Sequence, residues 1–316
     1  MSQVVLTVSP SIMNEIKKKY NSLLSDKQPP GSIFVAKTPS CTITGYRSGK
    51  VMFQGTAAEA EAKPWQSSSK PSTSSKSSAK KKVGDHQFAP PAHISTLSAI
   101  GSDEVGTGDF FGPITVAAAF VDQKQIPLLK ELGVRDSKGM KDPEIIEIAR
   151  NLIKTIPYSL LVLPNQKYNA MQKKGMNQGK MKALLHNQAI QNVQRKIPSY
   201  DAILIDQFAK PEIYFNYLKG QSTIVKENVY FATKAEEIHL AVAAASIIAR
   251  YSFVMEIDKL GKENNVKLPK GAGAAVDLAA AKLIQKHGED VLNQLAKTHF
   301  ANSLKAKKIA EKSNRN

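Results

Sequence analysis

The spacing of hydrophobic residues predicts a small mixed domain at the start of the chain. VVLTVS alternates apolar and polar positions and predicts a strand, while residues 10–24 carry apolar side chains at helical spacing. Residues 32–55 then predict successive strands broken at Pro39 and at the glycine turn 45–49, and AAEAEAKPW predicts a closing helix. We therefore expect residues 1–62 to form a small α+β domain.

A larger pattern of strands and helices begins near residue 90. The apolar runs HISTLSAIGSD and FGPITVAAAFVD flank a glycine-rich turn and predict two antiparallel strands. The segments downstream predict strands at 158–164 and 201–208 and helices at 142–156, 181–196, 235–260 and 276–284. This order predicts an α/β fold for residues 90–316, with the Ala-rich middle of the longest helix packed closely against a sheet.

The segment between these two parts has a composition that does not support a core. Residues 63–87 are rich in Ser and Lys and nearly free of apolar side chains, so burial cannot offset the entropy of ordering them. We expect residues 63–89 to form a flexible linker. Its lysines would add only loose phosphate contacts: Lys70, Lys76, Lys80, Lys81 and Lys82.

The charge of the chain narrows the class of partner. The 316 residues include 44 Lys and Arg against 27 Asp and Glu, which gives a net charge of +17. A surface this basic attracts polyanions, and nucleic acid is favoured over a membrane because the sequence shows no basic helix with a Trp/Phe/Leu face. Four residues of the first domain leave two interpretations open, a basic binding sheet or solvated strand positions: Lys37, Tyr46, Arg47 and Lys50.

Cysteine content and apolar runs indicate the compartment. The single cysteine, Cys41, excludes an intrachain disulfide and fits a reducing environment. MSQVVLTVSP lacks a basic region followed by a long apolar run, so we expect no signal peptide. The longest apolar run, near 240–249, is predicted to be too short to cross a bilayer. We expect a soluble, cytoplasmic monomer that does not bind membranes.

Four carboxylates occupy positions that are unusual for acids. Asp103 and Glu104 end the first strand of the second domain, Asp206 ends an all-apolar strand, and Glu236 stands at the start of the longest helix. Strand ends in α/β sheets are where ligands bind, and clustered carboxylates repel one another unless cations hold them. Oxygen-only ligation suits Mg²⁺ or Mn²⁺, and two such ions can act on a phosphodiester.

These acids also have ordinary interpretations. Asp206 suits a strand end that opens a turn, and Glu236 with Glu237 suits a helix N-terminus. Adjacent strand residues face opposite ways, so we expect the strand to break at Glu104 if both acids reach one ion. GTGDFFG does not have the G-x-G-x-x-G spacing of a dinucleotide site, and a strand rather than a helix follows it, so that interpretation is rejected.

The motifs of the second domain, taken together, resemble those of bacterial ribonucleases HIII, which belong to the type 2 ribonucleases H. The resemblance is carried by DEVGTGDFFGP, RDSK, LIDQF, TKAEEIHLAVAAASIIAR and LPKGAGAAVD, which span the region after the linker. It implies a ribonuclease H fold, in which helices flank a mixed sheet. It also implies that the first domain is similar to half of a TATA-binding protein and that this domain binds the substrate. It also implies Mg²⁺- or Mn²⁺-dependent endonucleolytic cleavage of the RNA strand of RNA·DNA hybrids, leaving 5′-phosphate and 3′-OH ends.

The resemblance also assigns residues. The catalytic and metal-binding carboxylates fall on Asp103, Glu104, Asp206 and Glu236, with Glu237 one residue away from the last position. Substrate contacts are expected from seven further residues: Gly106, Thr107, Gly108, Lys138, Ser246, Lys270 and Gly271. Ser246 also fits a small packing residue of an Ala-rich helix.

The triplet Gly106-Thr107-Gly108 stands where ribonucleases HII carry Gly-Arg-Gly. This difference implies poor cleavage at a single ribonucleotide embedded in DNA. Two other classes stay open at this stage, a hybrid- or duplex-binding protein without catalysis and, on charge alone, a membrane-surface binder.

Overall fold

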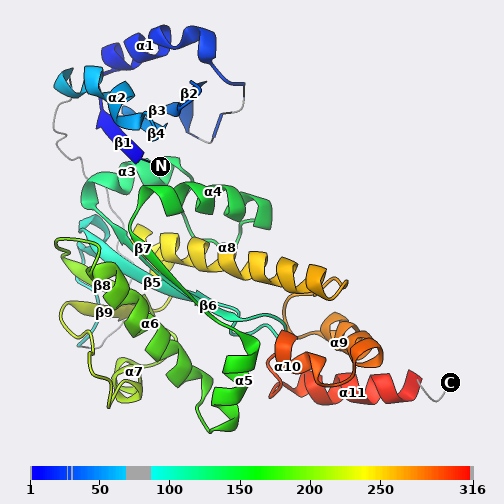
Figure 1. Ribbon diagram of the computed structural model, residues 1–316. Coiled ribbons are helices and arrows are strands. Elements are labelled where there is room, and N and C mark those ends of the chain that lie inside the picture. The colour runs from blue at the N-terminus through cyan, green and yellow to red at the C-terminus, as the bar shows by residue number, and fades with distance from the viewer. Residues whose placement is uncertain (1, 27, 30, 69–86, 314–316) are drawn as a thin grey trace.

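The computed structural model describes residues 2–26, 28–29, 31–68 and 87–313, which form two packed domains (Figure 1). The first is a four-stranded antiparallel sheet in the order β1-β4-β3-β2 with helices on one face. Its elements are β1 (Ser2–Thr7), α1 (Pro10–Lys19), η1 (Asn21–Leu23), β2 (Ser32–Lys37), β3 (Cys41–Tyr46), β4 (Lys50–Gly55), α2 (Ala58–Ala62) and η2 (Lys63–Ser68).

The core of this domain lies between its sheet and α1. Alternate strand residues such as Phe34, Ile43 and Phe53 point toward α1 and are fully buried, as the period-two pattern predicts. Trp65 packs against this core from η2, so residues 63–68 are helical although their composition had placed them in the linker. The remaining linker residues 69–86, with Lys70, Lys76 and Lys80–Lys82, lie outside the described residues.

The second domain is built on a mixed five-stranded sheet in the order β7-β6-β5-β8-β9. β5 pairs antiparallel with β6 and parallel with β8, so its C-terminal end lies beside that of β8. The strands are β5 (Ala99–Val105), β6 (Ile114–Val121), β7 (Tyr158–Leu163), β8 (Ala202–Asp206) and β9 (Val229–Ala232). The helices are η3 (Ile94–Thr96), η4 (Gln123–Gln125), α3 (Ile126–Glu131), α4 (Asp142–Thr155), α5 (Asn165–Lys173), α6 (Gln178–Gln194), α7 (Pro211–Tyr217), η5 (Ala235–Glu237), α8 (Leu240–Glu263), α9 (Ala274–His287), α10 (Val291–Leu295) and α11 (Ala301–Ser313).

Helices cover both faces of this sheet. α8 packs on one face with α4 outside it, and α6 packs on the other, so each face has its own apolar cluster. The contact between α8 and β5 is close because residue 101 has no side chain. A Cβ on Gly101 would lie 2.1 Å from the backbone nitrogen of Val242 and 2.2 Å from the carbonyl carbon of Ala241.

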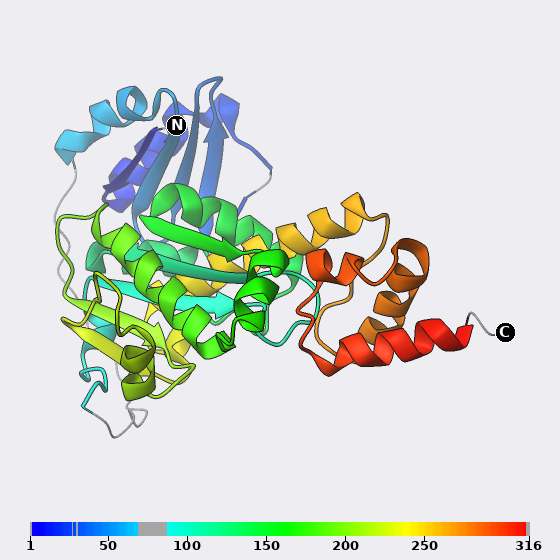
Figure 2. The ribbon, with the colours of Figure 1, turned by 60° about the horizontal axis from the view of Figure 1, so that its bottom comes forward.

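The C-terminal helices α9, α10 and α11 form a unit beside the sheet (Figure 2). This unit holds the glycine-rich loop that follows β5. The amide of Gly112 donates to the carbonyl of Leu295, and the amide of Lys297 donates to the carbonyl of Phe110. The fully buried Lys297 Nζ also donates to the carbonyls of Asp109 and Gly112, at 2.8 and 2.6 Å.

The sheet of the first domain packs its other face toward the second domain. Tyr46 and Met52 are almost fully buried and belong to the apolar cluster that contains Leu128 and Leu152. Lys50 Nζ donates to the carbonyl of Lys124 across the same boundary. Of the four residues considered for a basic sheet, two are thus engaged between domains, and Lys37 and Arg47 are exposed.

Three further predictions about elements differ from what the structure shows. Residues 93–98 do not extend β5 but form η3 and a short connection, because Ile94 is buried in a separate apolar cluster under the sheet. The predicted helix 235–260 is divided into η5 and α8, with His239 capping α8 by accepting from the amide of Ala241.

The third difference concerns the longest apolar helix. α8 has 24 residues and contains an 18-residue window with a mean hydropathy of 1.6. It is therefore long and apolar enough to cross a membrane, contrary to the expectation from residues 240–249. However, 72% of that apolar window is buried, and α8 packs against β5, β6 and α4. These contacts are those of a core helix.

Candidate active site

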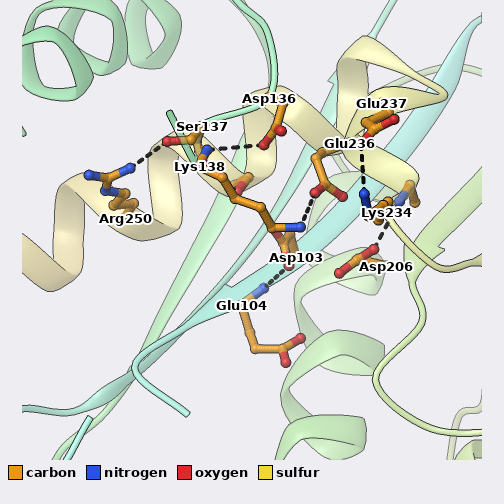
Figure 3. Close-up of polar contacts among 12 residues, drawn as sticks. Asp103, Glu104, Asp136, Ser137, Lys138, Asp206, Lys234, Glu236, Glu237 and Arg250 are labelled. Carbon is orange, nitrogen blue, oxygen red and sulfur yellow. Dashed lines mark hydrogen bonds and ion pairs between the residues drawn. The ribbon is translucent and has the colours of Figure 1, made fainter. Parts of the chain in front are cut away.

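The paired acids Asp103 and Glu104 lie within β5, which continues to Val105 without the break expected at Glu104. Their side chains therefore project to opposite faces of the strand, and Figure 3 shows them pointing apart. Asp103 is buried on the face covered by α8, and its Oδ1 accepts from the amide of Glu104 at 2.7 Å. The carboxylate of Glu104 lies on the α6 side.

Asp206 and Glu236 approach from the neighbouring strand and from η5. Asp206 ends β8, and its Oδ1 accepts from the amide of Ala235 at 2.9 Å, which fixes η5 against the strand end. Lys234 adopts a left-handed conformation (φ 56°) just before η5 and so turns the chain toward the sheet. Glu236 is thereby buried near the strand ends, as Figure 3 shows.

The structure distinguishes Glu236 from its neighbour Glu237. Glu236 is 5% exposed and its Oε1 accepts from Lys138 Nζ at 2.5 Å, whereas the side chain of Glu237 is 28% exposed and pairs with Lys234 at 3.3 Å. The Oε2 atom of Glu236 is buried without a hydrogen-bond partner. Glu236 is therefore the member of the pair that faces the other acids.

The buried acids repel one another. The pKa of Asp103 is raised well above its usual value by burial first and then by the charges of Glu104 and Asp206, while hydrogen bonds from Ser246 and the Glu104 amide oppose this. Burial also raises the pKa of Asp206, and the charges of Glu236 and Glu104 add to the effect. Burial and like charge thus disfavour the ionised form of both aspartates.

The pKa of Glu104 shifts in the opposite direction, because a lysine and a histidine contact its carboxylate. Lys182 Nζ lies 2.7 Å from Oε1 and His186 Nε2 lies 2.9 Å from Oε2, both on α6. Burial would raise the pKa of Glu104, but these two partners outweigh burial and lower it below its usual value. Glu104 is therefore the acid of this group whose ionised form the protein itself stabilises.

The residues fit a divalent cation by their chemistry. Within the described ranges, no three His, Cys, Asp or Glu side chains stand together as a ready-made ligand group. However, all four candidate donors are carboxylates, Glu236 Oε2 has no partner, and Asp103 and Asp206 carry charge that a cation would offset. Hard oxygen donors of this kind are those that Mg²⁺ and Mn²⁺ prefer.

The glycine triplet forms a loop directly after the carboxylate pair. Gly106 has φ 95°, and a Cβ there would lie 2.2 Å from the carbonyl of Pro113, whereas a Cβ on Gly108 would meet nothing within 4 Å. The carbonyl of Thr107 accepts from Gln178 Nε2 at 3.1 Å, and its hydroxyl is buried without a partner. The backbone conformation at residue 106 and the nearby Pro113 carbonyl therefore require glycine there, whereas the structure has room for a side chain at residue 108.

The other expected substrate contacts have different positions. Lys138 contacts Glu236, and its side chain is 66% exposed. Ser246 is 5% exposed, and its hydroxyl lies 2.9 Å from Ser137 Oγ. A hydrogen bond from Ser246 also opposes the rise in the pKa of Asp103. Lys270 pairs with Asp142.

Gly271, next to Lys270, belongs to the loop on the C-terminal side of the glycine triplet. Its amide donates to Asp109 Oδ1 at 2.6 Å and its carbonyl accepts from the amide of Phe110. Gly271 thus holds the loop that contains the triplet.

Lys182 and His186 are site residues that the sequence reasoning missed. They are buried polar side chains four residues apart on the inner face of α6, where apolar residues and the buried Asn187 surround them, and this spacing is visible in MKALLH. A Lys and a His on a buried helical face require partners, and an acid on a facing strand is the expected one.

Comparison with known proteins shows the family of the chain. Residues 100–303 match the ribonuclease HII family, and residues 3–79 match a domain of unknown function, DUF3378. The chain is 60% identical over 314 residues to ribonuclease HIII of Bacillus subtilis strain 168, covering 99% of each protein. The chain belongs to the ribonuclease HIII family. It is also 58% identical to ribonuclease HIII of Bacillus licheniformis over 99% of this chain and 100% of that protein.

Solved structures of ribonucleases HIII share the architecture. The crystal structure of Bst-RNase HIII in complex with Mn²⁺ superposes with a TM-score of 0.69 at 47% identity, covering 98% of this chain and 100% of that one. Aquifex aeolicus RNase H3, at 21% identity and a TM-score of 0.53, shares the fold. The predicted ribonuclease H fold, the small α+β domain before it and the resemblance to ribonuclease HIII are confirmed, and the chain is a nuclease of this family.

Proposed function

We propose that the chain is an endoribonuclease that hydrolyses the RNA strand of RNA·DNA hybrids with Mg²⁺ or Mn²⁺, leaving 5′-phosphate and 3′-OH ends. The observation that carries this proposal is the gathering of Asp103, Asp206 and Glu236 at the ends of β5 and β8, with Glu236 Oε2 buried and unpartnered, on a chain of net charge +17. An acidic centre on a basic protein attracts both a cation and a polyanion. The family relationship supports the same substrate.

Each residue of the site has a proposed part in the reaction. Asp103, Glu104, Asp206 and Glu236 would hold two divalent cations, which when bound supply the Lewis acidity that activates water and stabilises the leaving oxygen. Lys138 pairs with Glu236 and, because its side chain is 66% exposed, is placed to contact a phosphate.

The glycine loop has a proposed role in recognising the substrate. Gly108 is the open position of the triplet, so backbone close to it can approach the substrate without a side chain intervening. The backbone amides of the glycine loop would donate hydrogen bonds to a phosphate or to the 2′-OH that distinguishes RNA from DNA. Because the triplet carries Thr107 in place of arginine, we expect weak cleavage at a single ribonucleotide.

The decisive experiment compares three end-labelled duplexes under Mg²⁺ and under Mn²⁺. The substrates are RNA opposite DNA, DNA with a single ribonucleotide, and RNA opposite RNA. Cleavage of the first alone is expected. Efficient cleavage at the single ribonucleotide would refute the specificity argument, and binding of the hybrid without any cleavage would support a non-catalytic binding protein instead. Asp103→Asn and Asp206→Asn should lose turnover and keep hybrid binding.

The first domain is proposed to add to hybrid binding through its exposed basic residues. Lys37 lines a groove of about 850 Å³ between the first sheet and α4, and Arg47, which directly follows β3, is exposed. Lys37→Gln with Arg47→Gln should raise KM for the hybrid and leave kcat unchanged, because phosphate contacts far from the reaction act on binding. Lys18→Gln is the matched control, since α1 covers the opposite face of that sheet.

The cellular setting is part of the proposal. Cys41 is buried and free, which suits a reducing cytoplasm, and nothing in the proposed reaction requires a second subunit. Primer removal and R-loop clearance are both tasks that fit an enzyme of this specificity. A monomer in gel filtration with light scattering is the expected result.

A further inference from the structure

A buried polar network extends from Glu104 into the α6 side of the sheet. Ser102 Oγ lies 2.6 Å from His186 Nδ1, His186 Nε2 lies 2.9 Å from Glu104 Oε2, and Lys182 Nζ lies 2.7 Å from Glu104 Oε1. Ser102 and Glu104 come from the same face of β5, two residues apart. Both oxygens of the Glu104 carboxylate are therefore held from α6.

The hydrogen bonds of this network have a direction. The ring Nε2–H of His186 donates to Glu104 Oε2, while Ser102 Oγ lies 2.6 Å from His186 Nδ1 and donates to the carbonyl of Ala117 at 3.0 Å. Glu104 then receives a ring N–H whose orientation the serine fixes. The order Ser–His–Glu matches that of hydrolytic triads, but Ser102 and His186 are 0% exposed, which excludes attack by the serine on a substrate.

An aromatic ring closes the network on its outer side. Phe208 stacks on His186 with ring centroids 5.0 Å apart, and Lys182 Nζ lies 4.2 Å from the centroid of the same ring. Phe208 follows Asp206 by two residues, so the ring ties the end of β8 to the partners of Glu104 on β5. The side chain of Lys182 is only 8% exposed, which leaves it little access to a substrate phosphate.

We infer that Lys182 and His186 are positioning residues that fix the Glu104 carboxylate for cation binding, with Ser102 orienting the imidazole. Their hydrogen bonds to both of its oxygens hold Glu104 in one rotamer before a cation arrives. Outer contacts of this kind orient ligands at metal sites and keep them from rotating away. This inference rests on the proposed function, because it assigns Glu104 a ligand role.

The first test measures Mn²⁺ binding by calorimetry on the full-length protein without substrate. His186→Phe keeps a planar ring and removes the donor, and we expect it to weaken Mn²⁺ binding ~10-fold or more. His186→Gln can place an amide N–H near the position of Nε2 and should recover most of the affinity. Ser102→Ala is the mild variant, with a smaller loss in the same direction, and it serves if His186→Phe does not fold. Unchanged Mn²⁺ affinity in Ser102→Ala and in a folded His186→Phe would overturn the inference.

The second test separates positioning from substrate contact. Lys182→Met should lower kcat on a hybrid ~10–100-fold with KM changed less than twofold, whereas Lys130→Met on the exposed side of α3 should change neither. A rise in KM with kcat retained would show that Lys182 binds substrate and would refute the inference. In a Glu104→Gln background, Lys182→Met should add no further loss, because its partner is already neutral.

The two proposals fail in different ways. If the wild-type protein cleaves no hybrid yet His186→Phe weakens Mn²⁺ binding and His186→Gln restores it, the positioning inference stands and the proposed reaction does not. If hybrid cleavage is normal in Lys182→Met and Mn²⁺ binding is normal in His186→Phe, the reaction stands and the positioning inference is wrong.

Discussion

Lys297 offers a prediction whose size can be worked out from the structure. Its ammonium is fully buried, and within the described part of the chain its hydrogen-bond acceptors are the carbonyls of Asp109 and Gly112. Burial lowers the pKa of Lys297 from 10.5 to about 7, and the charge of Asp109 opposes this only in part. Lys297→Met keeps the length of the side chain and removes the titrating group.

The sign follows from the difference in bound protons. Between pH 7 and pH 10.5 the unfolded chain keeps the Lys297 proton while the folded protein loses it, so stability rises with pH in this range. With pKa values of about 7 folded and 10.5 unfolded, the free energy of unfolding should increase by about 2 kcal/mol from pH 7 to pH 9. The methionine variant lacks this increase. The free energy of unfolding of the wild type should therefore rise by about 2 kcal/mol relative to that of the variant between pH 7 and pH 9.

Urea unfolding of both proteins at pH 7 and pH 9 measures this difference. Far-UV circular dichroism is the suitable signal, because the single tryptophan, Trp65, lies in the first domain and would report on that part alone. Other titrating groups cancel when the two proteins are compared at the same pH. A stability gap that stays constant between pH 7 and pH 9 would refute the low pKa and the burial argument behind it.

Three further predictions follow from the site. Asp103→Asn should raise the melting temperature of the metal-free protein while abolishing turnover, because it removes a buried carboxyl whose ionised form is disfavoured by burial and by the charges of Glu104 and Asp206; a lower melting temperature would contradict this. Mn²⁺ binding should release protons and tighten as pH rises, because burial and like charge shift the pKa of both aspartates upward and a bound cation opposes that shift, and calorimetry in buffers of different ionisation enthalpy measures the release. Gly106→Ala should lower hybrid affinity and stability through its clash with Pro113, whereas Gly108→Ala should fold with wild-type stability, as thermal melts will show.

Local patterns in the sequence predicted most of the elements and the four acids. The period-two and helical spacings located the strands and helices because each depends on residues close in the chain. Asp206 was found because a charged residue ends an all-apolar strand, and Glu236 because the motif before α8 resembles that of the family. The choice between Glu236 and Glu237 required the structure, since only the turn at Lys234 decides which one faces inward.

Contacts between distant elements were not predictable in the same way. The ion pair of Lys138 with Glu236 was not predictable, because a flexible lysine pairs with whichever acid the fold brings near it. Tyr46 was considered for a binding sheet, yet it is buried against the second domain, and no pattern within residues 41–46 indicates which face of the sheet is covered. The partners of Glu104 lie 78 and 82 residues away on α6, so only the tertiary arrangement reveals them.

The missing side chain at Gly101 has a consequence for how this enzyme tolerates change. Because α8 rests on the backbone of β5 at that point, a single added methyl group would push the helix away from the strand. Glu236 and Ser246 would move with it, and Asp103 would stay behind. Catalysis would then be lost although no charge or substrate contact had changed, so a screen that scores only polar positions would overlook this residue. Mg²⁺ demands stricter coordination geometry than larger cations do. Shifts in the distance between Asp103 and Glu236 that are smaller than the one caused by a methyl group should therefore change which metal ion supports activity without abolishing it.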